Sequence, residues 1–355
     1  MTTPLGRTIA QLIQLNGPMS VADYMALCLG DPEHGYYMTR DPLGAAGDFT
    51  TAPEVSQMFG EIVGAWLVHL WHSLGSPCPA RLVELGPGRG TLMADILRVG
   101  SRAPGFLDGV TVHLVEMSPA LRRVQEATLR AAGARMFWHG ELSDVPDGPT
   151  LLVANEFFDA LPVRQFLRIA GSWRERAVGL APDGSLCFGI GAGRLADGPD
   201  APDGAVLETS PARDANMAQV VARFGQSPGA MLVIDYGHTQ PGFGESLQAV
   251  RHHRYTDLLT DPGEADLTSH VDFAALAAVA RSAGAAVHGP MPQGEFLLRL
   301  GIGARAERLA QGKSAAEAAA LQAQLERLTA PDQMGTLFKV MAVTDPSLRP
   351  PPFDS

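Results

Sequence analysis

The sequence predicts an α/β protein whose core is a doubly wound, mostly parallel sheet. Three observations support this fold class. Short apolar runs alternate with helical stretches between residues 81 and 156, a glycine-rich turn directly follows the first run, and 46% of the 355 residues are hydrophobic. Alternating strands and helices favour a parallel sheet, and a chain of this composition can bury a large core. We expect the last strand of the sheet to run antiparallel.

The N-terminal segment, residues 1–75, is expected to be helical, with one long loop at 30–54. A helix is predicted from Thr51 to about Leu74. Thr51 can cap it, the proline at 53 needs no N–H there, and the glutamate at 54 can reach back to the cap. The loop before this helix is long for a simple connection, and long loops are often functional.

Segment 76–162 is predicted to form the first half of the sheet. Its apolar runs lie at 81–85, 110–116, 135–139 and 150–156. Segment 163–228 interrupts the alternation, because three short strands, two of them joined by a Pro-Asp-Gly turn, predict an inserted antiparallel meander. The Gly/Asp/Pro-rich stretch 191–204 after these strands is predicted to be a mobile loop.

Segment 229–346 returns to the sheet, with apolar runs at 231–237, 285–289 and 337–343. Ser269 is predicted to cap a helix in this segment, with Asp272 completing a capping box. Residues 304–328 are rich in alanine and predicted to be helical. Residues 347–355 form a tail.

The composition argues against several classes of function. A formal net charge of −11 with only 27 Lys and Arg disfavours a nucleic-acid partner, because binding to phosphates needs clustered cations. Cys28, Cys78 and Cys187 are too widely spaced for a zinc site and odd in number for a disulfide framework. His69 and His72 lack a third ligand, so no metal is expected. Without a targeting signal or an apolar run of about 20 residues, we expect a cytoplasmic protein without stable membrane insertion.

The turn after the first predicted strand indicates a nucleotide-like cofactor. Glu84 ends the strand, and Gly86, Gly88 and Gly90 follow at alternate positions. Such a turn brings the backbone close to a ligand at a helix start. The dinucleotide fingerprint GxGxxG would need a glycine where Thr91 stands. The observed ExGxGxG spacing instead resembles motif I of the class I S-adenosylmethionine-dependent methyltransferases, which have a Rossmann-like fold.

Acidic and aromatic residues at the next strand ends extend this prediction. Glu116 ends the second strand, where an acid can accept ribose hydroxyls in either cofactor family, although a solvated strand-end glutamate is the alternative. After the third strand, where methyltransferases of this class build the adenine pocket, Trp138, His139 and Glu141 are candidates. Trp138 can equally belong to the core.

The fourth strand ends in Asn155 and Glu156, with Asp159 three residues on. Open α/β sheets place their chemistry at this edge. A carboxylate there suits an amine or guanidinium acceptor, because an arginine nitrogen is always protonated and its charge must be relieved as the methyl group arrives. The alternative for Glu156 and Asp159 is a pair of acids favoured by a helix N-terminus.

Several blocks in the same order resemble the MidA family, whose mitochondrial member is an assembly factor of respiratory complex I. These blocks are PEHGYY at 32–37, GDFTTAPE at 47–54, ELGPGRG at 84–90, ANEFFDALP at 154–162, IDYGH at 234–238 and DLTSHVDF at 266–273. The resemblance implies a class I methyltransferase fold and protein arginine N-methylation. The mitochondrial member's substrate is an arginine of an iron–sulfur-arm subunit, which it dimethylates symmetrically.

By the same resemblance, the glycine turn and Glu116 would hold S-adenosyl-L-methionine, with the N-terminal loop over the cofactor. Four residues of that loop would contribute, namely Gly47, Asp48, Thr50 and Thr51. His238 and His270 fall inside family blocks and are candidate site residues, although each can be structural. Relatives can carry an acid where Gly140 stands, so a side-chain contact to adenine there is not expected.

The leading hypothesis is therefore a protein arginine methyltransferase that acts on a complex I subunit during assembly. The sequence leaves the oligomeric state open, with a homodimer as one option. An assembly chaperone that binds the cofactor but has little catalytic activity is the alternative, and other methyl acceptors stay open. An NAD-dependent dehydrogenase is disfavoured by the glycine spacing.

Overall fold

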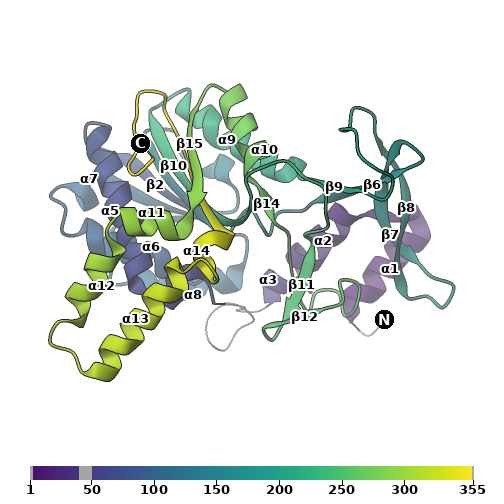
Figure 1. Ribbon diagram of the computed structural model, residues 1–355, viewed down its shortest axis with the longest axis horizontal. Coiled ribbons are helices and arrows are strands. Elements are labelled where there is room, and N and C mark those ends of the chain that lie inside the picture. Colours follow the sequence, from purple (N-terminus) through teal and green to yellow (C-terminus); the bar gives the residue numbers. More distant parts are fainter. Residues whose placement is uncertain (1–2, 40–49, 354–355) are drawn as a thin grey trace. The chain divides into compact units, whose positions relative to one another are not determined.

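The computed structural model describes residues 3–39 and 50–353, and the chain divides into two compact units (Figure 1). Unit 1 comprises Met1–Phe49, Asp159–Ala215 and Gln240–His270. Unit 2 comprises Thr50–Phe158, Asn216–Thr239 and Val271–Ser355. Each unit is therefore assembled from three segments that are far apart in the sequence.

Unit 2 contains an eight-stranded sheet in the order β15-β16-β10-β5-β2-β3-β4, with β14 beside β10. Strands β4, β3, β2, β5 and β10 are parallel, and β16 runs antiparallel to β10. The predicted doubly wound sheet with an antiparallel last strand is confirmed. The strand bounds are β2 Ala80–Leu85, β3 Val110–Val115, β4 Met136–His139, β5 Thr150–Asn155, β10 Gly229–His238, β14 Val271–Asp272, β15 Ala286–Pro292 and β16 Phe338–Thr344.

The order of this sheet creates a switch point between two neighbouring strands. From β2 the chain moves outward to β3 and β4, and it then returns to β5 on the other side of β2. Open α/β sheets bind ligands in the crevice at the carboxyl ends of such strands. The switch point therefore brings the glycine turn at the end of β2 to the same edge as Asn155 and Glu156 at the end of β5.

Helices cover both faces of the sheet, as Figure 1 shows for α5, α6 and α10 around β2, β10 and β15. Phe59 and Trp66 of α5 and Ile96 of α6 belong to the same buried cluster as Leu82 and Val112 of the sheet. The helix bounds in or entering unit 2 are α4 Ala52–Val55, α5 Gln57–Ser73, α6 Thr91–Gly100, α7 Phe106–Gly109, α8 Pro119–Leu129, α9 Pro211–Phe224, α10 Phe273–Ser282, α11 Gln293–Arg299, α12 Ile302–Ala310, α13 Ala315–Thr329 and α14 Met334–Leu337, with a 3₁₀ turn at Leu142–Asp144.

Unit 1 combines helices α1 Pro4–Asn16, α2 Val21–Gly30 and α3 Tyr36–Thr39 with two antiparallel sheets. The larger sheet has the order β1-β7-β6-β9, with β8 beside β7, and the smaller has the order β12-β11-β13. The predicted antiparallel meander is confirmed by β6, β7 and β8. The strand bounds are β1 Met19–Ser20, β6 Arg164–Ile169, β7 Ser172–Leu180, β8 Leu186–Leu195, β9 Val206–Thr209, β11 Gln248–Arg251, β12 Arg254–Thr256 and β13 Asp266–Thr268.

One predicted helix begins after Thr51 as expected but is interrupted, and another begins later than predicted. The helix expected from Thr51 to Leu74 is broken at Ser56, which is extended (φ −161°) and accepts a hydrogen bond from the N–H of Met58, so that α5 starts afresh. The helix expected to start at Ser269 begins after Asp272, whose carboxylate caps α10. A polar side chain that bonds a nearby N–H decides where a helix begins.

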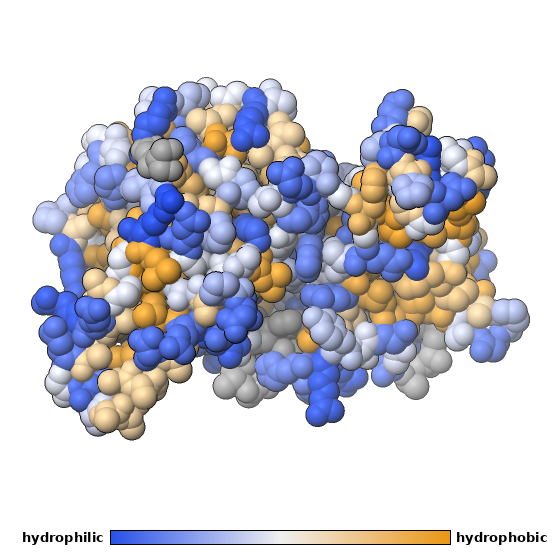
Figure 2. Space-filling view, in the orientation of Figure 1, coloured by the Kyte–Doolittle hydropathy of each residue, from blue (hydrophilic) through white to orange (hydrophobic). Residues whose placement is uncertain are grey.

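One other expectation needs correction. The stretch 191–204 is only partly a loop, because β8 continues to Leu195 and the carboxylate of Asp203 accepts hydrogen bonds from the N–H groups of Ala170 and Gly171. The alanine-rich region is helical as predicted and forms two helices, α12 and α13. Figure 2 shows moderately hydrophobic residues over this hairpin, where α13 buries Leu328 but exposes most of its alanines. Those alanines favour the helix by propensity rather than by core packing.

Candidate functional site

The glycine turn links β2 to α6 and has a backbone conformation that favours glycine at three positions. Gly86, Gly88 and Gly90 have φ values of +61°, +53° and +82°, a region that other residues rarely adopt. A Cβ atom on Gly86 would also lie 3.0 Å from Cδ2 of Phe157. The three glycines therefore let the backbone turn sharply beneath the Phe157 ring and present its amides at the helix start.

Glu84 and Asn155 lie at the carboxyl ends of β2 and β5, and each has a buried oxygen without a partner. The side chains are 3% and 8% exposed, respectively. Among the described residues, Oε2 of Glu84 and Oδ1 of Asn155 accept no hydrogen bond. Burial raises the pKa of Glu84 to about 8. Such atoms are costly in an apolar setting unless a ligand satisfies them, so they mark a place for a donor or a cation.

Glu156 has a strained backbone immediately after β5. Its φ is +51°, and its N–H donates to the carbonyl of Ile234 at 2.9 Å. Its Oε1 accepts hydrogen bonds of 3.2 Å from the backbone N–H of Ala52 and from Nδ2 of Asn155. Left-handed non-glycine residues cost energy and concentrate at functional sites. The carboxylate of Glu156 is thus oriented at the switch point by the backbone of Ala52 and by the side chain of Asn155.

Residues 50–54, the last part of the predicted N-terminal loop, lie at this same edge. Besides the bond from Ala52, the hydroxyl of Thr91 at the start of α6 donates to Oε1 of Glu54. Thr50 and Thr51 directly precede these contacts. The predicted residues Gly47 and Asp48 lie outside the described residues.

Glu116 follows β3 and is held by the helix after it. One carboxylate oxygen accepts from the N–H of Ser118 at 2.7 Å, and the other accepts from Nε2 of Gln125 at 3.2 Å. Its backbone carbonyl accepts from the guanidinium of Arg122. Burial raises the pKa of Glu116, while these donors oppose that shift. The carboxylate is fixed, and each oxygen keeps a second lone pair for a ligand.

The three candidates after the third strand have different environments. Nε1 of Trp138 donates to Oε1 of Gln125 at 3.0 Å, which joins it to Glu116. Nε2 of His139 lies 2.9 Å from Nδ1 of His113, which is buried within β3. Burial is the largest cause of the lowered pKa of both histidines, to about 4 for His113. The exposed Glu141 caps the 3₁₀ turn that begins at Leu142.

Of the predicted acceptor residues, His238 belongs to unit 2, and Asp159 and His270 belong to unit 1. His238 extends β10 beyond β5, and its Nδ1 lies 3.9 Å from Oδ1 of Asp272. Within unit 1, the buried guanidinium of Arg213 donates to the backbone carbonyls of Asp159 (3.3 Å) and His270 (2.8 Å).

The same unit 1 contacts fix the Ser269–His270 segment from two sides. Arg213 also donates to the carbonyl and hydroxyl of Ser269, and the N–H of Ser269 donates to the carbonyl of Asp159 at 3.1 Å. The N–H of His270 donates to Oγ of Ser246 at 2.9 Å. Sequence reasoning missed Arg213 and Ser246, because their partners are 24 to 57 positions away and no local pattern links them.

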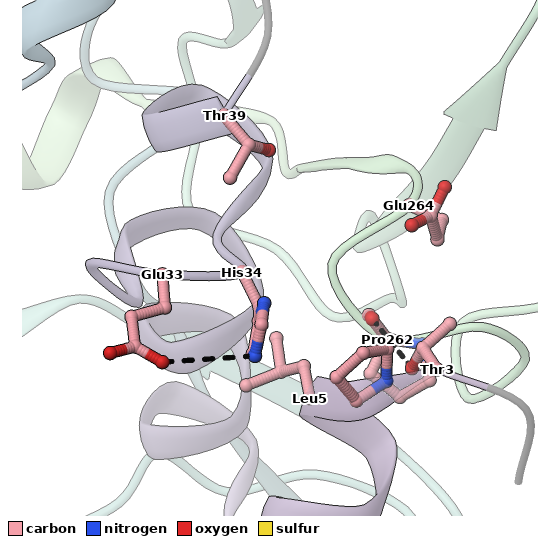
Figure 3. Close-up of a pocket in the computed structure, with 8 residues that line it drawn as sticks. Thr3, Leu5, Glu33, His34, Thr39, Pro262 and Glu264 are labelled. Carbon is pink, nitrogen blue, oxygen red and sulfur yellow. Dashed lines mark hydrogen bonds and ion pairs between the residues drawn. The ribbon is translucent and has the colours of Figure 1, made fainter.

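Unit 1 also contains a shallow cavity of about 240 Å³ (Figure 3). Basic side chains lie near its carboxylates: Nε2 of His34 lies 4.0 Å from Glu33, and NH2 of Arg251 lies 3.4 Å from Glu264. None of the predicted site residues lines it. The lining residues are Thr3, Pro4, Leu5, Glu33, His34, Thr39, Pro262 and Glu264.

The described part of the chain contains neither a metal-binding cluster nor a membrane-spanning helix. Within residues 3–39 and 50–353, no three or more His, Cys, Asp and Glu side chains are grouped so that they could hold a metal ion. No helix in the same ranges has the length and apolar character needed to cross a membrane.

Comparison with known proteins places this site in a family. Residues 62–291 match a family of S-adenosyl-L-methionine-dependent methyltransferases. The chain is 37% identical to the mitochondrial protein arginine methyltransferase NDUFAF7 homolog of Drosophila melanogaster, over 96% of this chain and 84% of that one. It is 35% identical to protein arginine methyltransferase NDUFAF7, mitochondrial, of Danio rerio, over 94% of this chain and 85% of that one.

A solved structure resembles the whole chain. The protein, from Burkholderia thailandensis, is bound to S-adenosyl-homocysteine. It is 27% identical, with a TM-score of 0.83, and the match covers 97% of this chain and 94% of that chain. A native structure from the same organism matches with 28% identity and a TM-score of 0.81.

The residues at the switch point fit S-adenosyl-L-methionine, which is the cofactor of this family. The cofactor carries a positive sulfonium and a positive ammonium group, and the partnerless oxygens of Glu84 and Asn155 are acceptors for such charge. The positive φ angles of Gly86, Gly88 and Gly90 turn the backbone at this edge of the sheet. Because the matches extend over almost the whole chain, the protein belongs to the S-adenosyl-L-methionine-dependent methyltransferase family.

Proposed function

We propose that this methyltransferase methylates an arginine side chain of a protein, and that the protein is a subunit of the respiratory NADH dehydrogenase, complex I. The observation that carries the proposal is the carboxylate of Glu156, oriented at the switch point by Ala52 and Asn155. Two further findings support it: the curated relatives are named protein arginine methyltransferases, and the MidA-like blocks at 84–90 and 154–162 include residues of this site.

For the cofactor, we assign the backbone around Gly86, Gly88 and Gly90 to the methionine part and Glu116 to the ribose hydroxyls. The second lone pairs of Glu116 support that role. Glu84 and Asn155 supply acceptors for positive charge. Bound there, S-adenosyl-L-methionine supplies an electrophilic methyl group.

The adenine end of the site includes Trp138, because its indole is tied to the residues that hold Glu116. His139 and Glu141 are assigned to the same pocket with less support, since their side chains contact His113 and cap a turn. Thr50 and Thr51, together with Gly47 and Asp48 beyond the described residues, are assigned to the loop that covers the cofactor.

For the acceptor, the carboxylate of Glu156 would orient the guanidinium and stabilise its charge. A guanidinium nitrogen is protonated at neutral pH, so one proton must leave as the new N–C bond forms. Glu156 can hold that proton, and positioning of this kind can supply about 7–11 kcal/mol of the barrier reduction. Asn155 supports Glu156 directly. His238, Asp159 and His270 are further candidates for acceptor binding.

Two finer parts of the proposal rest on the MidA resemblance, namely a substrate in the iron–sulfur arm of complex I and symmetric dimethylation. Action in the bacterial cytoplasm and a homodimer are further parts of the proposal. The net charge of −11 suits a cationic acceptor segment and disfavours nucleic acid. The dimer prediction is checked by the mass of the purified protein in solution.

The decisive experiment incubates the purified chain with methyl-labelled cofactor and an extract of cells that lack its gene. Labelled protein is then hydrolysed, and the methylated residue and subunit are identified. We expect label in the methylarginine of one complex I subunit. Label on another residue type or in small molecules would overturn the acceptor assignment.

A matched pair of variants then separates catalysis from simple binding. Glu156→Gln should abolish labelling while cofactor binding persists, because the carboxylate is lost and the side-chain shape is kept. Glu126→Gln, at an exposed position of α8, is the control and should label normally. If Glu156→Gln cells assemble complex I normally and the wild-type chain transfers no label, the chain acts as an assembly chaperone instead.

A further inference from the structure

Gln125 is a fully buried amide at the centre of the cofactor side of unit 2. It lies on α8 with an exposed fraction of 0%. Leu121 and Leu129, four residues before and after it, are the other buried residues of this helix. A polar residue on such an apolar face is costly unless its hydrogen bonds are satisfied.

Both the NH₂ group and the carbonyl oxygen of this amide form hydrogen bonds, and each bond reaches a different part of the site. Nε2 donates to the carbonyl of Gly88 at 2.8 Å and to Oε2 of Glu116 at 3.2 Å. Oε1 accepts from Nε1 of Trp138 at 3.0 Å. One side chain therefore connects the glycine turn, the acid after β3 and the aromatic residue of β4.

The three partners also define the orientation of the amide. Both acceptors, Gly88 and Glu116, lie on the Nε2 side, and the single donor, Trp138, lies on the Oε1 side. A flipped amide would face two acceptors with its oxygen and lose all three bonds. No side chain of similar shape forms the same hydrogen bonds. An ionised carboxylate cannot donate, and a methionine thioether cannot donate and accepts only weakly.

We propose that Gln125 is a positioning residue for S-adenosyl-L-methionine, acting through Gly88, Glu116 and Trp138. By holding these three groups in place before the cofactor arrives, it reduces the ordering that binding must otherwise impose. This positioning matters most for the carboxylate of Glu116, because Ser118 fixes one of its oxygens and Gln125 fixes the other. This inference concerns cofactor binding and holds whichever acceptor the enzyme uses.

The first test measures binding of S-adenosyl-L-methionine to the full chain by isothermal titration calorimetry. Gln125→Met keeps the approximate volume and removes all three bonds. We expect affinity to fall about 10-fold or more, the effect of losing a hydrogen bond to a charged group. Gln293→Met is the matched control, because Gln293 is equally buried in unit 2 and its Nε2 donates to the carbonyl of Leu328 instead. We expect it to lower stability and leave affinity unchanged.

The second test uses a pH profile, which a general loss of packing would not produce. Gln125→Glu introduces a carboxyl group that faces Glu116 and the carbonyl of Gly88, with Arg122 the nearby cation. Ionised at alkaline pH, this carboxyl group cannot donate and repels Glu116, whereas its protonated form at lower pH can donate a hydrogen bond again. The variant's affinity relative to wild type should therefore recover as the pH falls.

Thermal unfolding without the cofactor establishes that each variant is folded before it is titrated. If a folded Gln125→Met chain binds S-adenosyl-L-methionine as tightly as wild type, or if the affinity ratio of Gln125→Glu is independent of pH, the positioning role is wrong. If Gln125→Met does not fold, the pH profile of Gln125→Glu alone decides. An equal loss of affinity in Gln293→Met would also overturn the proposal, because the effect would then be one of stability.

Discussion

The backbone N–H of Ala52 donates a 3.2 Å hydrogen bond to Oε1 of Glu156, although the two residues are 104 positions apart in the sequence. Ala52 is the first residue of α4, and Glu156 is the strained residue after β5. The orientation of the proposed catalytic carboxylate therefore depends on a backbone amide of a separate segment, which side-chain substitutions leave in place.

Removing that amide hydrogen tests its role. Ala52→Pro keeps a residue favoured in the first turn of a helix and deletes the donor. Thr51, at φ −75° and ψ 161°, already has the extended conformation that a residue before proline requires. We expect methyl transfer at saturating cofactor to fall about 10-fold or more, since hydrogen bonds to charged groups contribute about 1.5–3 kcal/mol.

The control for this change is Ala52→Gly, which keeps the N–H and loses only a methyl group. It should retain activity and cost about 1 kcal/mol of stability, because Ala52 is fully buried. Both variants are compared by initial rate and by denaturant unfolding. Equal rates in the two would show that the Ala52 amide does not orient Glu156.

Gly86→Ala should abolish cofactor binding, although its cost in folding stability should be small. Alanine at φ +61° costs about 1 kcal/mol, and its Cβ would lie 3.0 Å from the Phe157 ring at the turn. Gly133→Ala imposes similar strain at φ +70° with open space around the new Cβ. The measurement is the rise in Tm on adding S-adenosyl-L-methionine, which should be lost in the first variant and kept in the second. A normal rise in Gly86→Ala would contradict the role assigned to this turn.

Glu84→Gln should make the cofactor-free protein more stable at alkaline pH. The pKa of Glu84 is about 8 in the folded chain and near 4.5 otherwise. The folded state thus retains a proton that the unfolded state releases, so the contribution of Glu84 is fully present below about pH 4.5 and is lost as the pH rises through about 8. The amide has no proton to lose, and the expected gain at pH 8 is on the order of a few kcal/mol.

Chemical unfolding of wild type and variant between about pH 5 and 8.5 measures this difference. The free energies of unfolding should agree at the acidic end and diverge above it. The variant should also bind S-adenosyl-L-methionine more weakly, because the acceptor for positive charge is gone. Glu126→Gln, at an exposed position, should follow wild type throughout. Parallel curves for Glu84→Gln and wild type would show that Glu84 is ionised in the folded chain.

Arg213→Lys should impair acceptor binding in unit 1 and leave cofactor binding in unit 2 intact. The guanidinium contacts four acceptors on Asp159, Ser269 and His270, and a lysine ammonium cannot reach them all. Because these contacts lie within unit 1 and the cofactor residues lie in unit 2, we expect methyl transfer to fall about 10-fold while cofactor affinity is unchanged. Arg194→Lys, on the exposed part of β8, is the control. An unaltered rate would remove Asp159 and His270 from the acceptor site.

The sequence was sufficient to predict the sheet and the residues at its edge. Apolar runs and a glycine turn are local signals, and right-handed crossovers then restrict how parallel strands can be ordered. This is why Glu84, Gly86, Glu116 and Asn155 could be located before any coordinates were known. The break at Ser56 was missed because a serine hydroxyl can either face solvent or cap a new helix, and its surroundings decide between them.

The hydrogen-bond partners at the site could not be predicted in the same way. Gln125 gave one weak signal, a glutamine between two buried leucines at helical spacing. Arg213 and the amide of Ala52 gave none, because their partners lie 54 to 57 and 104 positions away, respectively. A sequence pattern identifies which residue types can bind, whereas the partner of each one depends on the tertiary fold.

The interleaving of the two units affects how the chain is made on the ribosome. The apolar faces of α1 and α2, with Leu5, Ile9 and Tyr24, pack against Val163 and Leu267 in segments translated much later. At about 5 to 20 residues per second, synthesis from residue 49 to residue 270 takes about 10 to 45 s. Until the later segments emerge, the N-terminal helices have only one another to cover their apolar faces, and the cluster is complete only when Leu267 has been made. Nascent-chain chaperones therefore have a defined target in the first 30 residues, and unit 1 completes its folding only after most of unit 2 has left the exit tunnel.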